Sequence, residues 1–159
     1  MTQAHFHLLI THLPIFGSIL GGIVLAYALY SRSTHTKIAA FILLTISSIG
    51  AILSYLTGEA AEELAENIPG VSENAIGAHE ESAYISLLLL ILLGLSALVG
   101  LFFSIKKSSQ IKKISIFTLI VAIICFFQIS RTGFLGGQIR HHELIQNNSE
   151  IQNTDFDED

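Results

Sequence analysis

Four apolar runs, each about as long as a membrane-crossing helix, constrain this chain more than any other feature. They cover residues 6–30, 38–56, 84–105 and 114–134, and each approaches the roughly 20 residues that a helix needs to cross hydrocarbon. Of the 159 residues, 51% are hydrophobic and only 13% are charged. Because a soluble domain of this size could not bury so much apolar surface, the sequence predicts a single, all-α, integral membrane domain.

Basic residues indicate which connections between the runs face the cytoplasm, because Lys and Arg gather in cytoplasmic loops. Six of the eight basic residues lie in the first and third connections: Arg32, Lys37, Lys106, Lys107, Lys112 and Lys113. We therefore expect a multi-pass protein of the bacterial inner (cytoplasmic) membrane, with both termini and the acidic second connection in the periplasm. The net charge of −5 and the lack of a basic stripe exclude nucleic acid as a partner.

The acidic second connection, residues 57–82, carries a helical pattern of its own. Four glutamates follow the i, i+3, i+4, i+7 spacing of one helix face: Glu59, Glu62, Glu63 and Glu66. Pro69 and Gly70 are expected to stop this helix, and Ser72 is a suitable N-cap for one that continues into the third run. The prediction is an up-down four-helix bundle over residues 1–146, with helices two, three and four extending beyond the outer face, and a disordered acidic tail over residues 147–159.

Histidines gather at the outward ends of the predicted helices. At about 1.5 Å per residue they reach overlapping depths near the outer edge of the hydrocarbon. A single histidine at an interface is usually solvated, and this interpretation is kept for His5, His35 and His142. Histidines from three helices at one level instead predict a shared site, because facing imidazoles suit haem iron, and imidazole with carboxylate suits Zn, Fe, Mn or Cu. The predicted ligands are His7, His12, His79 and His141.

Charged side chains are expected at the same level as these histidines. A carboxylate can ligate a metal or orient a ligand histidine, and the candidates are Glu59, Glu63, Glu80 and Glu143. The alternative for the glutamates is a solvated helix face. Arg131 lies inside the fourth apolar run and keeps its charge, so it needs a partner. That partner is an outward carboxylate such as Glu59 or a haem propionate, unless the side chain extends to the lipid headgroups.

Two segments resemble a known family. Residues 7–15 read HLLITHLPI and are similar to the His-Pro-Leu-Leu-Val-His-Phe-Pro-Ile opening of a family of uncharacterised bacterial four-helix membrane proteins, a catalogued domain of unknown function. Residues 132–144 read TGFLGGQIRHHEL and resemble that family's Gly-Trp-Leu-Gly-Gly segment, which some members continue as Gln-Ile-Arg-His-x-Glu. The resemblance covers most of the chain except the tail, and fusions of some members to cytochrome c-like domains imply a redox setting. It implies site roles for His7, His12, His79, His141 and Glu143.

Three functions fit these observations. The first is a small membrane redox protein that holds b-type haem, with quinone, a cytochrome c or respiratory subunits as partners. Glycines such as Gly17, or Gly136 and Gly137, would make room for the porphyrin. In it, Arg131 or Arg140 would pair with the propionates. The second is a non-haem Zn, Fe or Cu site of His and Glu, and the third is a cofactor-free scaffold subunit. The sequence leaves open whether the protein is an enzyme and whether it forms a homo-oligomer in the lipid bilayer.

Overall fold

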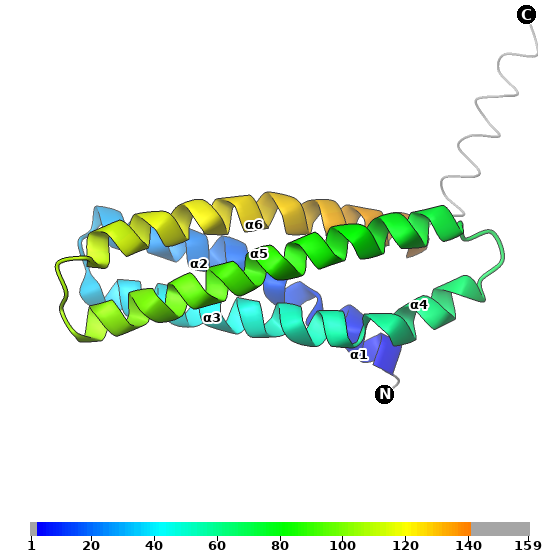
Figure 1. Ribbon diagram of the computed structural model, residues 1–159, viewed down its shortest axis with the longest axis horizontal. Helices are drawn as coiled ribbons and strands as arrows, with labels where there is room; N and C mark the ends of the chain where they lie inside the picture. Colours follow the sequence, from blue (N-terminus) through cyan, green and yellow to red (C-terminus); the bar gives the residue numbers. More distant parts are fainter. Residues whose placement is uncertain (1–2, 141–159) are drawn as a thin grey trace, which may run out of the picture.

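The computed structural model describes residues 3–140 as a bundle of helices (Figure 1). The helices are α1 (Gln3–Ile10), α2 (His12–Tyr30), α3 (Thr34–Leu56), α4 (Gly58–Glu66), α5 (Glu73–Ile105) and α6 (Ile111–Arg140). No strand occurs within these residues. Four stretches are long and apolar enough to cross a membrane: Ala4–Tyr30, Thr34–Leu56, Glu73–Ile105 and Ile111–Ile139. The predicted all-α bundle is confirmed, and its four apolar helices indicate a multi-pass membrane protein.

The first predicted span is divided at Thr11 into α1 and α2. Pro14 has no amide hydrogen, so the carbonyl of Ile10 loses the donor that a continuous helix would provide. The Thr11 amide still donates to the His7 carbonyl at 3.0 Å, and Thr11 keeps helical dihedrals, with φ −60° and ψ −25°. The break is therefore local, and α1 continues outward from α2 with a change of direction (Figure 1).

The helix of the second predicted span ends at Leu56, and a break at Thr57 separates α3 from α4. Its φ of −105° and ψ of 2° leave the helical region, and α4 then carries the predicted glutamate face beyond the span. Gly70, with a φ of 89°, turns the chain toward α5. Ser72 is extended at the start of α5, although its side chain makes no capping hydrogen bond. The predicted helical extensions are confirmed as far as Arg140, whereas the boundary at residue 146 and the tail lie outside the described residues.

Small residues bring the long helices close together in the middle of the bundle. A Cβ atom on Gly17 would lie 2.7 Å from the Cβ atom of Ser47, and a Cβ atom on Gly94 would collide with the Ser48 hydroxyl. In a membrane, apolar burial gives little drive to helix association, so such close approach matters. Ser47 also donates its hydroxyl to the Pro14 carbonyl at 3.1 Å. These contacts join α2 and α5 to α3.

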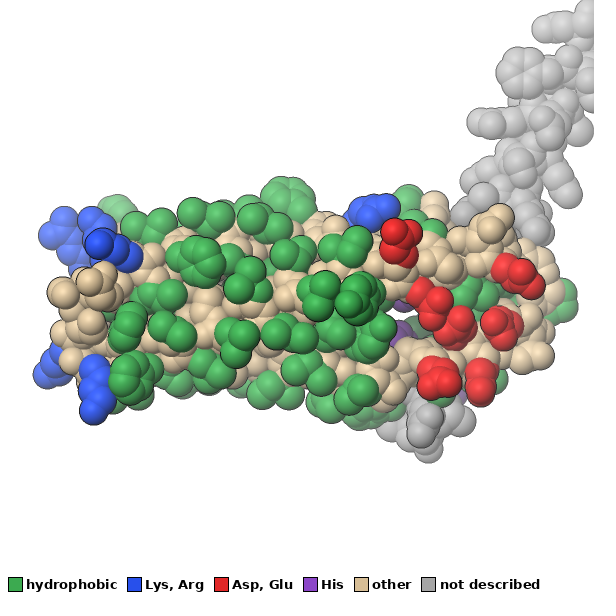
Figure 2. Space-filling model, viewed as in Figure 1, with side chains coloured by type: hydrophobic (Ala, Val, Ile, Leu, Met, Phe, Trp, Pro, Cys, Tyr) green, Lys and Arg blue, Asp and Glu red, His purple; other side chains and the backbone are tan. Residues whose placement is uncertain are grey.

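The outer surface is apolar between two charged ends (Figure 2). Basic side chains gather at the end formed by the turns over residues 31–33 and 106–110, which is called the basic end below. Acidic side chains gather at the other end, the acidic end, on α4 and the first turns of α5. Large hydrophobic side chains between them face outward, as a lipid-facing belt requires. Examples are Leu20, Ile46, Leu95 and Ile120.

Candidate functional site

The ring of His7 is held against the outer end of α3. Its Nδ1 atom lies 2.9 Å from the main-chain carbonyl oxygen of Ser54 and 3.3 Å from the hydroxyl oxygen of Thr57. Because a carbonyl oxygen only accepts hydrogen bonds, Nδ1 carries the hydrogen, and Nε2 carries the lone pair of the neutral ring. The half-buried His7 is therefore held in the tautomer that ligates metals through Nε2.

His79, on α5, makes the same kind of contact with α6. Its Nδ1 atom lies 3.0 Å from the main-chain carbonyl oxygen of Thr132, so the same tautomer follows. Gly136 lies against the ring, because a Cβ atom there would be 3.0 Å from the His79 Cε1 atom. Within residues 3–140, neither His7 nor His79 has a hydrogen bond at Nε2. Both rings thus keep one nitrogen available for a ligand.

A buried network of hydroxyl and amide groups holds Thr132 in place. Its hydroxyl donates to the Gln128 carbonyl at 3.2 Å, so it accepts from the Ser82 and Ser86 hydroxyls, whose oxygens lie 2.7 and 2.8 Å away. The Gln128 side-chain amide donates to Ser82 at 3.2 Å. Ser82 and Ser86 follow His79 by three and seven positions, so they share its face of α5. The network sets the register between α5 and α6 that brings His79 to the Thr132 carbonyl.

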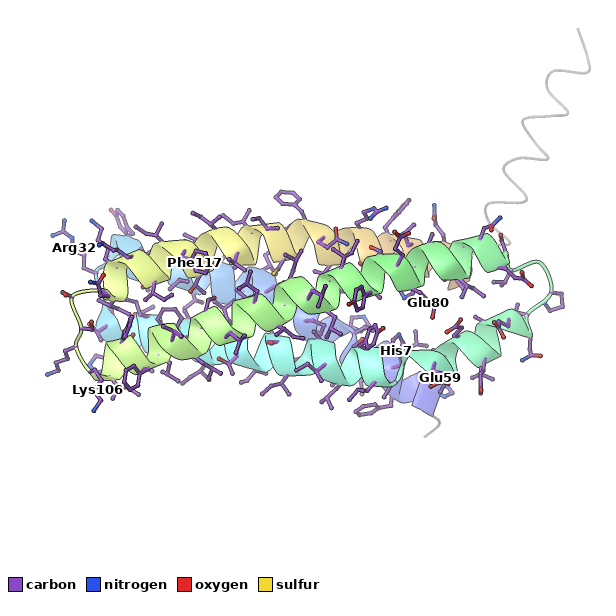
Figure 3. All side chains as sticks on the ribbon, in the orientation of Figure 1. His7, Arg32, Glu59, Glu80, Lys106 and Phe117 are labelled. Carbon is purple, nitrogen blue, oxygen red and sulfur yellow. The ribbon has the colours of Figure 1, made fainter. Side chains whose placement is uncertain are left out.

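His7 and His79 lie near each other where the apolar belt meets the acidic end. The His7 ring is held on the outer end of α3 and the His79 ring on α6, both at this end of the bundle. Figure 2 shows histidine side chains between the apolar belt and the carboxylates, and Figure 3 shows His7 at the same end of the bundle as Glu59 and Glu80. The structure therefore brings together two of the predicted histidine ligands, one from α1 and one from α5.

His12 does not join this pair. Its Nδ1 atom lies 2.9 Å from the Leu8 carbonyl oxygen, and its ring stacks on Phe16 with centroids 6.2 Å apart. The side chain is exposed. His12 follows His7 by five positions, which is roughly 140° around a helix at about 100° per residue, so the two rings face different sides. The expectation that His12 shares a centre with His7 and His79 is thereby corrected.

The glutamates face solvent rather than the histidines. Glu59, Glu63 and Glu80 are exposed, and no group of three His, Cys, Asp or Glu side chains in the described part of the chain is placed to hold a metal ion. The predicted His and Glu metal site is not assembled from these residues, because a shared depth does not make side chains face one another. A hydrogen bond to the Glu80 carboxyl, followed by burial and repulsion from Glu80, raises the pKa of Glu62.

The other predicted residues are placed as follows. Arg131 is exposed on α6, which favours extension of its side chain to lipid headgroups over burial inside the bundle. His35 is exposed near the basic end, as expected for a solvated histidine. His141 and Glu143 lie outside the described residues.

Sequence interpretation missed the groups that hold the two rings. Ser54 and Thr132 act through main-chain carbonyls, which every residue has, so their side chains gave no signal. Gln128 was a usable signal, because an amide inside an apolar run needs a partner. The glycines Gly58 and Gly136 were a second usable signal, since each follows a carbonyl that binds a histidine, that of Ser54 or Thr132, by four positions.

This site is defined by its geometry and not by similarity to a known protein. No family model, no curated protein and no solved structure matches the chain. The resemblance to the four-helix family therefore stays a prediction. The site itself consists of two imidazoles with available Nε2 atoms, and such nitrogen donors bind transition metals.

Proposed function

We propose that this protein is a small electron-transfer protein of the bacterial inner membrane that holds a b-type haem between His7 and His79. One observation carries the proposal: each imidazole donates its Nδ1 hydrogen to a main-chain carbonyl, at 2.9 Å and 3.0 Å. Metal-ligating histidines almost always donate the other ring hydrogen in this way, which fixes the ring and makes the ligating nitrogen more basic. The two rings come from different helices, and histidine is a common ligand of haem iron.

The donor set suits haem better than a bare metal ion. Haem iron is already held by the porphyrin, so the protein supplies only axial ligands. His7 and His79 each offer one available Nε2 atom, and residues 3–140 contain no group of three metal-binding side chains. A structural zinc site, in contrast, takes four protein ligands. Gly136 also leaves the flank of the His79 ring without a Cβ atom.

The chain's own residues would bind and orient the group. A bound b-type haem would supply a one-electron iron centre. His7 and His79 would ligate it, while the carbonyls of Ser54 and Thr132 hold the two rings in the required tautomer. The apolar belt would keep water from the inner side of the site.

Orientation suggests the partners. The basic end belongs in the cytoplasm by the positive-inside rule, so the acidic end and both termini would face the periplasm. Electrons would then pass between a quinone in the outer leaflet and a periplasmic cytochrome c or another respiratory subunit. Carboxylates around the site would favour encounter with a basic carrier. The exposed apolar faces also permit a homo-oligomer within the bilayer.

A Zn, Fe or Cu ion held by the same imidazoles is the second candidate. The observation in its favour is the carboxyl pair of Glu62 and Glu80, which a haem site does not require. Two imidazoles alone leave such an ion short of ligands. This candidate therefore requires water or a carboxylate, or His141 and Glu143, to complete the site.

The experiment is a visible spectrum and an elemental analysis of one detergent-purified sample. A Soret band with sharp reduced α and β bands, and iron at one atom per chain, supports the haem proposal. A colourless protein with stoichiometric Zn, Fe or Cu overturns it in favour of the ion. A folded protein with neither colour nor metal overturns both and leaves the scaffold subunit.

A further inference from the structure

The chain forms two helical hairpins. The first pairs α1 and α2 with α3, and the second pairs α5 with α6. At the basic end, their turns share two local features. Arg32 and Lys107 are the two non-glycine residues with positive φ among residues 3–140, at 53° and 52°. Each follows a helix C-cap in the right-handed region. Each precedes a serine that accepts a main-chain amide: Ser33 from Thr36, and Ser108 from Gln110. The two turns therefore share the left-handed residue and the serine acceptor that follows it, although three residues separate the helices in the first turn and five in the second.

At the acidic end, the two hairpins repeat a second feature. In each, a histidine on the first arm donates from Nδ1 to a main-chain carbonyl on the second arm, His7 to Ser54 and His79 to Thr132. The arms of the second hairpin, measured from Lys107, are each three residues longer than those of the first, measured from Arg32. Because both arms are longer by the same number of residues, the histidine and the carbonyl stay at the same height along the bundle. The hydrogen bond between them is therefore kept in the second hairpin.

A glycine follows each of these carbonyls by four positions. A helical side chain covers the turn on the N-terminal side of its own Cα, so the residue at i+4 shields the carbonyl of residue i. Gly58 and Gly136 remove that shield from Ser54 and Thr132. A Cβ atom on Gly136 would lie 3.0 Å from Cε1 and 3.2 Å from Nδ1 of His79. A Cβ atom at position 136 would therefore press on the ring, which would have to shift by a few tenths of an ångström from its hydrogen-bonding position.

The contact between the glycine and the histidine ring is tighter in the second hairpin than in the first. A Cβ atom on Gly58 would lie 3.8 Å from the His7 Cε1 atom, which is an ordinary contact, whereas the equivalent contact of 3.0 Å at Gly136 is tighter than an ordinary one. The break at Thr57 already opens the first carbonyl, while α6 passes Thr132 without a break. Gly137, next to Gly136, has no atom within 4 Å of its would-be Cβ atom. The chain thus contains its own matched control.

We infer that the site is built from two equivalent half-sites, one per hairpin, and that Gly136 is the positioning residue that fixes the His79 ring. Each half-site holds its imidazole with hydrogen on Nδ1 and the lone pair on Nε2. Resting on the proposed function, this assigns the site to a centre that takes one imidazole nitrogen from each hairpin, as the two axial positions of haem iron do. The tautomers themselves are properties of the chain without any cofactor.

The first experiment is NMR of protein carrying ¹⁵N-labelled histidine in detergent, with no haem or metal added. His79 is expected to show the Nδ1–H tautomer in the natural protein and in Gly137→Ala, and to lose it in Gly136→Ala. Both substitutions favour helix, so folding is retained. His7 is expected to keep its tautomer in Gly58→Ala. An unchanged His79 signal in Gly136→Ala, or an Nε2–H tautomer in the natural protein, overturns the inference.

The second experiment separates this inference from the proposed function. In haem-loaded protein, Gly136→Ala is expected to lower haem affinity by about 10- to 100-fold, the usual effect of losing a group that orients a ligand. Gly77→Ala, on the same helix as His79 and with no atom within 4 Å of its would-be Cβ atom, is expected to bind haem normally. If neither the natural protein nor any variant binds haem, but NMR shows the expected histidine tautomers, the proposed function is wrong and the two half-sites are still supported. If both glycine variants bind haem equally, Gly136 is not a positioning residue.

Discussion

The Nδ1 atom of His79 lies 3.0 Å from the main-chain carbonyl oxygen of Thr132, and the hydroxyl of the same Thr132 binds Ser82 and Ser86 of α5. One residue on α6 therefore holds both the imidazole and the helix that carries it. Because α5 and α6 belong to one hairpin, the geometry of the ring is tied to the packing of two spans.

Replacing Thr132 with valine tests this link. The substitution keeps the shape but leaves the Ser82 and Ser86 hydroxyls without their acceptor, at a cost of about 1 kcal/mol in the free energy of unfolding. Thr132→Ser keeps the hydroxyl and is the control. Unfolding in detergent, followed by circular dichroism, measures both variants. Equal loss in both would mean that the methyl group, rather than the hydroxyl, holds the helices.

Packing at Gly100 is expected to be intolerant of a side chain. A Cβ atom there would collide with the Phe41 ring of α3, and such overpacking costs roughly 1–3 kcal/mol. Gly77, on the same helix, has no atom within 4 Å of its would-be Cβ atom. Gly77→Ala is therefore expected to stabilise by up to about 1 kcal/mol through helix propensity. The melting temperature should be higher for Gly77→Ala than for the natural protein, and lower for Gly100→Ala. The reverse order would contradict the packing described for Gly100.

Stability at the acidic end is expected to depend on Glu62. Its pKa is raised by the hydrogen bond to Glu80, then by burial and by repulsion from neighbouring carboxylates. The folded protein therefore binds this proton more tightly than the unfolded chain does. The stabilisation is complete at low pH and is lost as pH rises above the ordinary glutamate value of 4.5 toward the raised pKa.

Glu62→Gln should flatten this part of the pH dependence. Melting temperatures measured from about pH 4 to about pH 7 would fall less with pH in the variant than in the natural protein. Glu63→Gln is the control, because Glu63 is not among the groups that act on Glu62. An identical slope in all three proteins would show that the carboxyl pair does not couple to folding.

Much of the fold could be predicted from the sequence because its determinants are local. Hydropathy over residues 38–56 and 84–105 marks spans wherever they pack, and the Pro69-Gly70 pair ends a helix through its own backbone limits. The glutamate spacing predicted α4 for the same reason. The break at Thr57 was not predicted, because residues 38–56 contain no proline and the helix passes their one glycine, Gly50, without a break.

The site was harder to predict because depth does not determine direction. Counting residues placed His12 near the level of His7, but the helix turns the two rings to different sides. Carboxylates such as Glu59 lie at the predicted end of the bundle, but they face solvent. The hydrogen bond from His79 to Thr132 joins residues 53 positions apart, so no local pattern reports it.

Membrane orientation can be measured with single cysteines. Cys125 is buried, and Cys125→Ser provides a background without it. In that background, Ser72→Cys at the acidic end should react with a membrane-impermeant maleimide in intact cells, once the outer membrane is permeabilised. Ser109→Cys at the basic end should react only after lysis. The opposite pattern would place the His7 and His79 site on the cytoplasmic side.

Haem content of three purified alanine variants tests the central claim most directly. His7→Ala and His79→Ala each remove one proposed axial ligand, whereas His12→Ala removes an outward-facing ring from the same end of the bundle. With protein folded by circular dichroism, the first two should lose at least about 10-fold in haem occupancy, judged by the Soret band per chain. His12→Ala should match the natural protein. Equal occupancy in all three variants, or a natural protein that binds no haem, would contradict the account.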